Sequence, residues 1–448
     1  MRILFCCQFY APSIGGVQEV MRQLAERLAA RGHDVMVATT KLTSRDFAVL
    51  NGVKVKEFEV AGNQARGLQG IIGAYARFVT STPFDIVMIN AAQQWTFDAL
   101  WPVLDKIEAG IVLVPCGFSG LYEPAYAGYF DRLPAVLKKF DHLVFNASDY
   151  RDIKFTKEHG IDKFSIIPNG ASEVEFAVDL DPLFRQRHSI GADDLLFLTV
   201  GSFTREKGYL EVVSAFLLAD FDGCPATLIL NGNECRYPEN GSAFTMMRDK
   251  VGSYNQVVQE VHESQGFGAA CAHVLHGVIN KMGIRAGRYA TDRKTFREDV
   301  QAVIDKIHSQ GSHKRVLMTD LPRPDLVQAY MNTDLFVFAS HVECSPLVLF
   351  ESVAAGTPFL SVPAGNAVEI TEWTGGGVIC PASQDERGYT KVDPRMFGEQ
   401  WAHLASNRAY LRQLGGVGKQ NWAARFTWEK ITGQYENVFR KVATHVQA

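Results

Sequence analysis

The 448-residue chain lacks the features that mark several classes of protein. It contains no uninterrupted run of ~18 apolar residues, the length that a membrane-spanning helix requires. The apolar run within its first eight residues is too short for a secretory signal and soon gives way to polar residues. We therefore expect a cytoplasmic protein, for which a peripheral contact with the cytoplasmic face of a membrane stays open.

Cysteine is sparse, and charge of one sign is not in excess. The eight cysteines never form a C-x-x-C pair, and most lie in apolar stretches where a thiol acts as a small hydrophobic group. This distribution disfavours a disulfide framework and a zinc site and favours a reducing compartment. The 45 Lys and Arg residues nearly balance 49 Asp and Glu residues, for a net charge of -4. Such a balance exerts no overall attraction on nucleic acid.

Short apolar runs rich in β-branched residues alternate with helical patterns in the first half of the chain. Continuous apolar strands separated by helices are typical of a parallel sheet that is covered on both faces. Between the first two runs, an apolar face on residues 17–28 predicts a helix that stops at Gly32. The predicted strands are residues 3–6, 35–39, 53–58, 85–89, 111–114, 143–145 and 165–167.

The same pattern restarts after a break near residues 170–190. We therefore predict an α/β protein with two doubly wound, Rossmann-like domains, at residues 1–175 and 176–425. An apolar stripe from Trp428 to Phe439 predicts a final amphipathic helix within residues 426–448. The predicted strands of the second domain are residues 195–200, 226–230, 315–318, 335–339, 359–362 and 377–379.

A long insertion at about 231–314 interrupts the second domain. Helical periodicity appears around residues 257–261 and 296–307. His273 and His276 have a spacing that would suit metal ligands on a helix, but no acidic or cysteine partner stands at a suitable offset. We interpret the insertion as a helical excursion that caps the domain.

The strongest candidate site follows the predicted strand 335–339. Two doubly wound domains in tandem leave a cleft between the C-terminal ends of their strands, and ligands usually bind there. The residues that directly follow the strands should therefore carry the chemistry. Ser345 and Pro346 read as an N-cap and a first-turn proline, so we predict that a helix begins there. The free amides of Leu347 and Val348 would then lie at a positive helix end that suits a diphosphate.

Two glutamates flank this predicted helix start. Glu351 lies on the face of the free amides and only ~5 Å further along the axis, at a rise of 1.5 Å per residue. Glu343 stands just ahead of the helix. A carboxylate on each side of an anion site suits a ligand with a sugar at one end and a ribose at the other. The alternative, a loop acid and a solvated helix acid, is disfavoured by the cap, the proline and the preceding strand.

Two further segments follow predicted strands. In the segment 201–208, Arg205 and Lys207 would neutralise a diphosphate and stabilise it as a leaving group, although a surface loop of mixed charge is an open alternative. The consecutive Gly15 and Gly16 let a backbone approach a phosphate or a sugar closely. The first loop lacks the G-x-G-x-x-G spacing of a dinucleotide site, which counts against a nicotinamide-dependent oxidoreductase.

Taken in order, these segments resemble the large retaining glycosyltransferase family 4, which has the GT-B fold. The resemblance covers nearly the whole chain apart from the insertion, and the ordered set of motifs is specific although each one is weak. The matching segments are Gly15-Gly16, 167–170, 201–208, 330–340, the E-x7-E element Glu343–Glu351, 354–358, Glu369-Ile370 and the closing Trp428 helix.

The resemblance implies a retaining, metal-independent transfer of a sugar from a nucleotide-diphosphate sugar, without a cofactor. Glu343 would bind the hydroxyls of the donor sugar, Glu351 the ribose, and Lys207 with Arg205 the diphosphate. The final helix would cross back to the N-terminal domain, and the domains would close on binding. The donor-binding residues would be Gly15, Gly16, Asn169, Ser202, Arg205, Lys207, Ser345, Pro346, Leu347, Val348 and Glu351.

The sequence departs from the family at two positions. Many members place a histidine that contacts the donor sugar where this chain has Cys116, whose thiol is a poor substitute for imidazole as a hydrogen-bonding group. A buried structural thiol is an equal alternative for Cys116. The family's arginine five positions before the lysine is Ser202 here, so we expect Arg205 to supply the missing charge.

The sequence says less about the acceptor than about the donor. We expect the acceptor on variable N-terminal loops, with Cys116, Gly117, Phe118 and Tyr122 as candidates for acceptor or donor-sugar contacts. Packing of the two aromatic side chains under a loop is an equal alternative. The acceptor would be a carbohydrate, a lipid-linked molecule or a small molecule, as in the assembly of a polysaccharide, glycolipid or glycoconjugate. A catalytically inactive relative that serves a glycan assembly complex is the alternative function, and the oligomeric state stays open.

Overall fold

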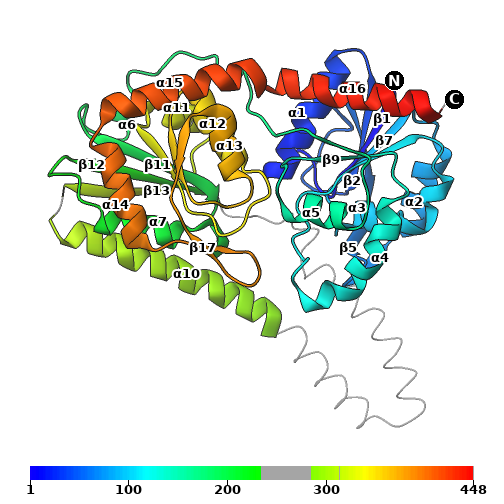
Figure 1. Cartoon of the computed structure of the whole chain (residues 1–448), viewed down its shortest axis with the longest axis horizontal. Coiled ribbons are helices and arrows are strands. Elements are labelled where there is room, and N and C mark those ends of the chain that lie inside the picture. Colours follow the sequence, from blue (N-terminus) through cyan, green and yellow to red (C-terminus); the bar gives the residue numbers. More distant parts are fainter. Residues whose placement is uncertain (234–283, 312, 447–448) are drawn as a thin grey trace, which may run out of the picture.

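The computed structural model describes residues 1–233, 284–311 and 313–446 of the chain (Figure 1). Two lobes stand side by side, and each contains a parallel sheet with helices on its two faces. This arrangement confirms the predicted α/β fold with two Rossmann-like units.

The first lobe is built on an eight-stranded sheet with the order β10-β9-β8-β7-β1-β2-β4-β3. All neighbours in it pair in parallel except β3 and β4. The central strands are buried on both faces, which explains their continuous apolar sequence. The strands are β1 (Arg2–Cys6), β2 (Asp34–Thr40), β3 (Val49–Leu50), β4 (Val53–Phe58), β7 (Ile86–Asn90), β8 (Gly110–Val114), β9 (His142–Phe145) and β10 (Phe164–Ile166).

The second lobe is built on a six-stranded, fully parallel sheet with the order β13-β12-β11-β14-β15-β16. The connection from β10 to β11 holds the domain boundary that the sequence predicts between residues 175 and 176, and that boundary stays a prediction. The strands are β11 (Leu195–Ser202), β12 (Ala226–Asn233), β13 (Lys314–Thr319), β14 (Leu335–Phe338), β15 (Phe359–Ser361) and β16 (Gly377–Ile379).

Helices cover the sheets, and two short hairpins that the apolar pattern did not predict lie outside them. The hairpins are β5 (Val60–Asn63) with β6 (Gly67–Gly70), and β17 (Ser383–Gln384) with β18 (Thr390–Lys391). The helices are α1 (Gly16–Ala30), α2 (Ile72–Ser81), α3 (Trp95–Asp98), α4 (Ala127–Leu137), α5 (Arg151–Glu158), α6 (Phe184–Arg187), α7 (Tyr209–Leu218), α10 (Ile284–Ser309), α11 (Arg323–Asn332), α12 (Leu347–Ala355), α13 (Ala367–Thr374), α14 (Pro394–Ala405), α15 (Arg408–Arg425) and α16 (Trp428–Val446).

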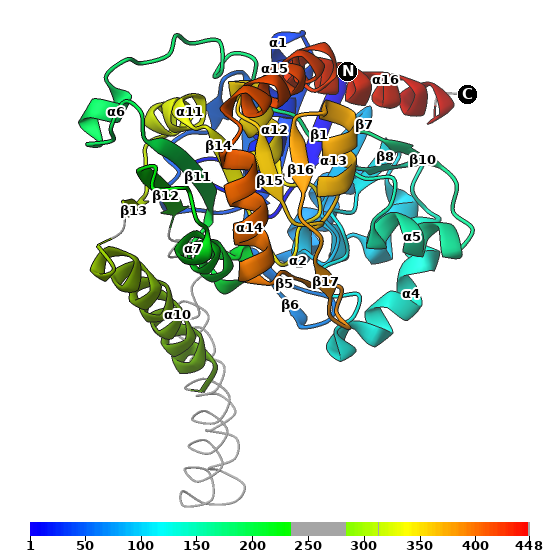
Figure 2. The same cartoon turned by 60° about the vertical axis from the view of Figure 1, so that its left-hand side comes forward.

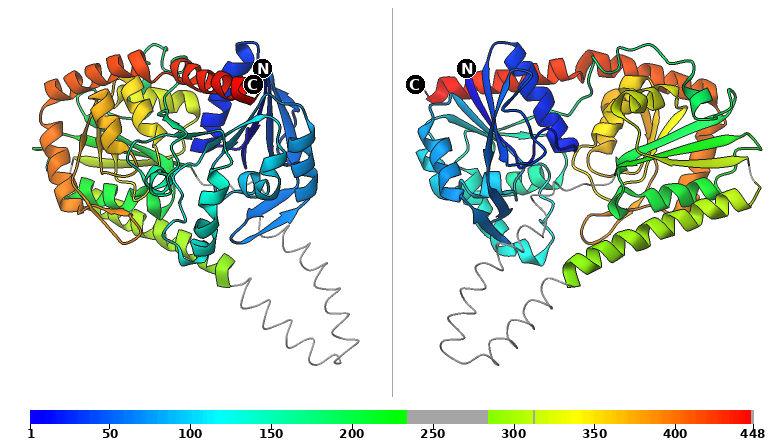
Figure 3. Two further views of the ribbon diagram at one scale, coloured as in Figure 1. Left: turned by 45° about the vertical axis from the view of Figure 1, so that its right-hand side comes forward. Right: turned by 180° about the vertical axis from the view of Figure 1, so that it is seen from behind.

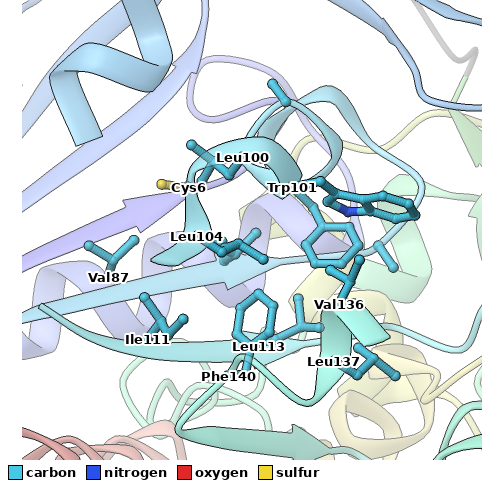
Figure 4. Packing of buried hydrophobic residues seen from close by; sticks show 14 of the residues in the cluster. Cys6, Val87, Leu100, Trp101, Leu104, Ile111, Leu113, Val136, Leu137 and Phe140 are labelled. Atoms are coloured by element: carbon cyan, nitrogen blue, oxygen red, sulfur yellow. The ribbon is translucent and has the colours of Figure 1, made fainter. Parts of the chain in front are cut away.

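One face of the first sheet carries a core of aliphatic and aromatic side chains (Figure 4). Val87 and Ile111 project from neighbouring strands toward Leu104 and Trp101 of the short helical segment 101–106. Phe140 closes the cluster beyond α4 and is 1% exposed. This packing fixes the strands whose carboxyl ends lead into the site.

The last helix returns to the first lobe. Figure 3 shows α15 lying along the second lobe and α16 continuing over the first, next to α1. Ile431, Tyr435 and Phe439 of α16 are buried with Phe5 of β1 and Met21 of α1 in one cluster. The predicted return of the C-terminal helix to the N-terminal domain is confirmed.

Part of the insertion lies within the described residues. Its first residues complete β12, and α10 covers the segment 296–307 where the sequence predicts a helix. Figure 2 shows α10 beside α7 at the edge of the second lobe, and Phe296 and Val300 of α10 are buried there. Residues 257–261, His273 and His276 lie outside the described residues. Within the described ranges, no helix is long and apolar enough to span a membrane.

Candidate functional site

The start of α12 differs from the prediction in its capping residue. The helix begins at Leu347, so Pro346 precedes it in an extended conformation, and Ser345 makes no capping hydrogen bond. The Ser345 hydroxyl is buried without a partner among the described residues. The amides of Leu347 and Val348 likewise donate to no described acceptor, so they remain available for an anion at the positive end of the helix. The predicted cap is wrong, whereas the predicted free amides are present.

Lys207 and Glu343 meet although they come from different loops. Nζ of Lys207 lies 2.5 Å from Oε1 of Glu343, whose other partner is the Ser340 hydroxyl at 2.8 Å. Gly208 permits this approach, because it has φ +70° and a Cβ there would lie 1.9 Å from the carbonyl oxygen of Ala339. The loops that follow β11 and β14 are therefore locked together, with the cation and the carboxylate in contact.

The glycine pair of the first lobe faces the same helix. A Cβ placed on Gly16 would lie 3.8 Å from the Cδ1 atom of Leu347, which places the start of α1 against the start of α12. Gly15 precedes α1 with φ 168° and ψ 165°, an extended backbone that any residue can adopt. The first lobe thus brings the backbone of its first post-strand loop against the Leu347 side chain at the start of α12.

Glu351 lies in an ion-pair network that the sequence did not predict. Its Oε1 atom lies 2.6 Å from a nitrogen of Arg323, and the same nitrogen lies 2.7 Å from Oε2 of Glu175. Burial alone would lower the pKa of Arg323, but the Glu351 and Glu175 carboxylates raise it, so the guanidinium stays charged. Glu351 is 9% exposed, so it does not face open solvent. Arg323 begins α11 directly after the loop that leaves β13, and this post-strand position is the signal that could have marked it.

Arg205 is turned toward the insertion. Its guanidinium lies 3.2 Å from Asp299 of α10 and 5.2 Å from the ring centroid of Phe296. Ser202 ends β11 and pairs with Asn233 of β12. The structure therefore does not bring Arg205 or Ser202 into the Lys207–Glu343 contact.

Cys116 lies in a loop with an unusual backbone. Cys116, Gly117 and Phe118 have φ values of +58°, +90° and +47°, a left-handed run that is rare for residues with a side chain. The Cys116 thiol donates to Oδ1 of Asn90 at 2.8 Å, and burial raises its pKa to about 12. A protonated, hydrogen-bonded thiol is a weak partner for a sugar hydroxyl, in line with the structural alternative for this residue.

Asp152 holds this loop in place, and the sequence did not single it out. Its Oδ2 atom accepts from the Gly117 amide at 2.7 Å, and its Oδ1 atom accepts from the Ile153 amide at 2.9 Å. Burial raises the pKa of Asp152 to about 6, although the two amides lower it. A Cβ placed on Gly117 would lie 3.2 Å from Sγ of Cys344, so the loop fits against the segment before α12. Asp152 lies in the segment that follows β9. The principle that residues after strand ends form the site could therefore have marked it as a candidate.

The two aromatic candidates of the acceptor region differ in position. Phe118 is 0% exposed and packs against Phe130 and Phe155, at centroid distances of 5.6 and 5.5 Å. It is a core residue and cannot contact an acceptor, which corrects the expectation. Tyr122 is 50% exposed and stays available for one.

Polar contacts join the carboxyl edges of the two sheets. Nδ2 of Asn169 donates to the carbonyl oxygen of Ser345 at 3.1 Å. The Glu369 carboxylate accepts from the Ser148 amide at 2.9 Å and from the Asp149 amide at 3.1 Å. Asn169, expected in the donor site, therefore lies beside the start of α12 with its amide nitrogen used in a contact between domains.

Cysteines and other metal-binding side chains are dispersed. The cysteines of the described ranges are all free, and three of them are buried. Within those ranges, no group of three or more His, Cys, Asp or Glu side chains is placed to hold a metal ion.

Comparison with known sequences identifies both halves of the chain. The model of Glycosyltransferase Family 4 matches residues 14–173, and the model of Glycosyl transferases group 1 matches residues 298–393. A D-inositol 3-phosphate glycosyltransferase of Thermobispora bispora is 29% identical over 125 residues. That match covers 28% of this chain and 27% of the relative, so it spans little more than a quarter of either protein.

Solved structures share the fold over almost the whole chain. Sucrose-phosphate synthase of Thermosynechococcus elongatus has a TM-score of 0.67 at 17% identity, covering 99% of both chains. The Anabaena protein HepE in complex with UDP has a TM-score of 0.64 at 13% identity, covering 98% of this chain and 100% of that one. HepE has also been solved in complex with UDP-glucose. At these identities the likeness concerns the fold alone.

The sequence and structural matches agree on one family. The two family models fall on the two lobes in chain order, and the two facing parallel sheets are those of the GT-B neighbours. The chain is a glycosyltransferase of the family 4 type with the GT-B fold.

Proposed function

We propose that the chain transfers a glycosyl group from a nucleotide-diphosphate sugar to an acceptor hydroxyl, with retention of the anomeric configuration. The observation that carries this proposal is the Lys207–Glu343 contact beside the free amides of α12. A cation and a carboxylate in contact, with a positive helix end a few residues after the carboxylate, suit a ligand that has both a diphosphate and sugar hydroxyls. The complexes of HepE with UDP and UDP-glucose show that a fold relative takes such ligands.

The residues divide the work by their chemistry. Lys207 would share its charge between Glu343 and the diphosphate, so that it stabilises the leaving group as negative charge develops. Glu343 would accept hydrogen bonds from the donor sugar, and Glu351 from the ribose, with Arg323 holding that carboxylate in place. Arg205 would have to leave Asp299 to reach the same diphosphate, so we assign the principal charge to Lys207.

The reaction exchanges one bond at the anomeric carbon. The bond from C1 to the diphosphate oxygen breaks, and a bond from C1 to the acceptor oxygen forms on the same face of the sugar. The acceptor proton passes to the departing diphosphate, so no external base is required. We propose that neither a metal ion nor a cofactor takes part. The acceptor would be a carbohydrate, a lipid-linked molecule or a small molecule, and glycan or glycolipid assembly is the expected setting.

A panel of nucleotide sugars tests the proposal. The purified chain is incubated with UDP-, GDP-, ADP- and dTDP-sugars, and release of the nucleoside diphosphate is measured with and without sugar acceptors. We expect turnover of one donor class and a loss of about 10²–10³-fold in kcat for Lys207→Ala, because a preorganised charge on the leaving group is removed. Lys41→Ala, which breaks the exposed 2.6 Å Lys41–Glu59 pair, is the matched control. Equal turnover by Lys207→Ala and wild type would contradict the assignment, and absence of turnover with every donor would overturn the function.

Retention has its own measurement. Proton NMR of the first-formed product reports the coupling constant of the anomeric proton, and we expect the configuration of the donor. An inverted product would contradict retention and leave the transfer reaction standing.

A further inference from the structure

Arg151 is a buried arginine whose N–H donors have no hydrogen-bond partner among the described residues. It is the first residue of α5 and is 7% exposed. Its guanidinium lies 5.4 Å from the ring centroid of Tyr122 and 5.2 Å from that of Tyr150. An arginine carries five N–H donors. In the described part of the chain, none of them has a hydrogen-bond acceptor or an ion-pair partner.

A second buried arginine shows that this state is not general in the molecule. Arg45 is 8% exposed, and its guanidinium donates to the backbone oxygens of Ala11, Thr40 and Tyr10 and to the Glu57 carboxylate. A buried charge is normally compensated in this way. The π faces of tyrosines attract a cation but accept no conventional hydrogen bond from its N–H groups, so they compensate Arg151 only in part.

The neighbouring Asp152 carboxylate attracts the charge of Arg151 but forms no hydrogen bond with it. Both oxygens of Asp152 accept from backbone amides, those of Gly117 and Ile153. The nitrogens of Arg151 are nevertheless not among the fully enclosed polar atoms that lack a partner, so they keep some contact with solvent. A group that arrives from solution can therefore reach them.

Arg151 lies where the two domains meet on the acceptor side of the site. A Cβ placed on Gly388, in the turn of the β17–β18 hairpin, would lie 3.7 Å from Nη2 of Arg151 and 3.7 Å from the ring of Tyr122. A Cβ on Gly117 would lie 2.8 Å from the ring of Tyr150. The guanidinium is thus bordered by the loop after β8, by α5 and by a hairpin of the second domain.

We propose that Arg151 binds an anionic group, a phosphate or a carboxylate, that the acceptor carries. The assignment of the anion to the acceptor rests on the proposed function, whereas the binding of an anion rests on the geometry around Arg151. The planar guanidinium matches the two oxygens of either group in a bidentate pair, and the half-exposed Tyr122 offers a face to the ring that bears the group. The diphosphate of the donor is assigned to Lys207 and the amides of α12, which leaves Arg151 for a separate anion.

Anion titration tests the site without knowledge of the acceptor. Inorganic phosphate and acetate are titrated by calorimetry into wild type, Lys207→Ala, Arg151→Met and Arg151→Lys. Arg425→Met is the control, because Arg425 also lies over an aromatic ring, 4.8 Å from that of Phe426, but is exposed. We expect phosphate binding to survive in Lys207→Ala and in Arg425→Met and to weaken at least 10-fold in Arg151→Met. Arg151→Lys keeps the positive charge, so its phosphate affinity should fall less than that of Arg151→Met.

Three results would overturn the site: no phosphate binding to wild type, unchanged binding to Arg151→Met, or complete loss of binding in Lys207→Ala. Thermal melts of each variant separate loss of binding from loss of fold, and Arg151→Lys keeps the test valid if the methionine variant unfolds. Hydrolysis of the nucleotide sugar identifies the source of the anion. If the acceptor carries it, Arg151→Met hydrolyses the donor within two-fold of wild type. A 10-fold rise in the donor KM would place the anion on the donor sugar and reject the acceptor assignment. Arg151-dependent phosphate binding in a chain that turns over no nucleotide sugar would sink the proposed function alone.

Discussion

The two sheets present different kinds of charge to the boundary between the domains. On the edge of the second sheet the charges are paired, Lys207 with Glu343 and Arg323 with Glu351. On the edge of the first sheet, Asp152 is held by backbone amides and Arg151 has no partner in the described chain.

This difference indicates how each edge would meet its ligand. Paired side chains can exchange a protein partner for a ligand without ever leaving a buried charge bare. An unpaired guanidinium gains its first full partner when an anion arrives, so it discriminates between charged and neutral ligands. We infer that the second sheet supplies general affinity for the donor and that the first sheet selects the acceptor.

The largest expected effect comes from separating Lys207 and Glu343. Both Lys207→Ala and Glu343→Gln should lower kcat by about 10²–10³-fold, because Lys207 is assigned to the departing diphosphate and Glu343 to the transferred sugar. If the pair acts as one unit, the double variant should lose little more than either single variant. Steady-state kinetics of the four proteins measures this coupling. Fully additive losses would show that the two residues act independently and would contradict the claim that Lys207 and Glu343 act as a pair.

Arg323→Gln should have the next largest effect, because it leaves Glu351 and Glu175 without their shared cation. We expect about 2 kcal/mol of lost stability, less than for a fully enclosed pair since the Arg323 side chain is 37% exposed. The donor KM should rise more than kcat falls, since Glu351 is assigned to the ribose. Denaturant unfolding and donor kinetics provide the two measurements. Arg425→Gln serves as the control. An unchanged donor KM in Arg323→Gln would contradict the assignment of Glu351 to the ribose.

Asp152 sharpens the comparison through pH. Its pKa is about 6 in the folded chain, against about 3.9 for an aspartate in an unfolded one. The folded state therefore takes up a proton that the unfolded state does not as pH falls from 7 toward 4, which stabilises the fold by up to about 2–3 kcal/mol. Asp152→Asn removes this contribution, so wild type should gain stability relative to the variant on acidification. Urea midpoints at pH 7.5, 6 and 4.5 test the sign. Parallel pH profiles would show that Asp152 does not titrate in this range.

The repeating features of the molecule followed from its sequence. Continuous apolar runs predicted both parallel sheets, because a strand that is buried on both faces must be apolar at every position. The post-strand segment 201–208 and the E-x7-E element placed Lys207 and Glu343 in the two loops that do meet. Each of these signals is local, since a few adjacent residues carry it.

Some failures are local, and others concern contacts between distant segments. The cap assigned to Ser345 was wrong because Pro346 takes the position before the helix and Ser345 lies one residue too early. Phe118 could have been an acceptor contact or a residue packed under a loop, and it lies in the core after a left-handed turn. Asp152 bonds to Gly117, 35 residues earlier, and no local pattern encodes such a distance. The unpaired state of Arg151 is also invisible in the sequence, because it depends on where every possible acceptor lies.

The smallest effect should come from replacing Glu369, a residue of the second domain that forms hydrogen bonds with the first domain. Its carboxylate accepts from the exposed Ser148 and Asp149 amides, and a solvent-exposed bond of this kind contributes about 0.5–1.5 kcal/mol. Glu369→Gln keeps one acceptor oxygen, so it should lose less than Glu369→Ala, and both should favour a more open arrangement of the domains. The radius of gyration from small-angle X-ray scattering should then increase, while kcat at saturating substrates changes less than the acceptor KM. Glu372→Ala, on the same helix but with no described bond to the first domain, is the control. Nδ2 of Asn366 also donates to the carbonyl oxygen of Asn146 across the two domains, at 2.9 Å. If Glu369→Ala scatters like wild type, this contact and that of Asn169 with Ser345 suffice to hold the domains together, and acceptor selection by the first sheet does not depend on Glu369.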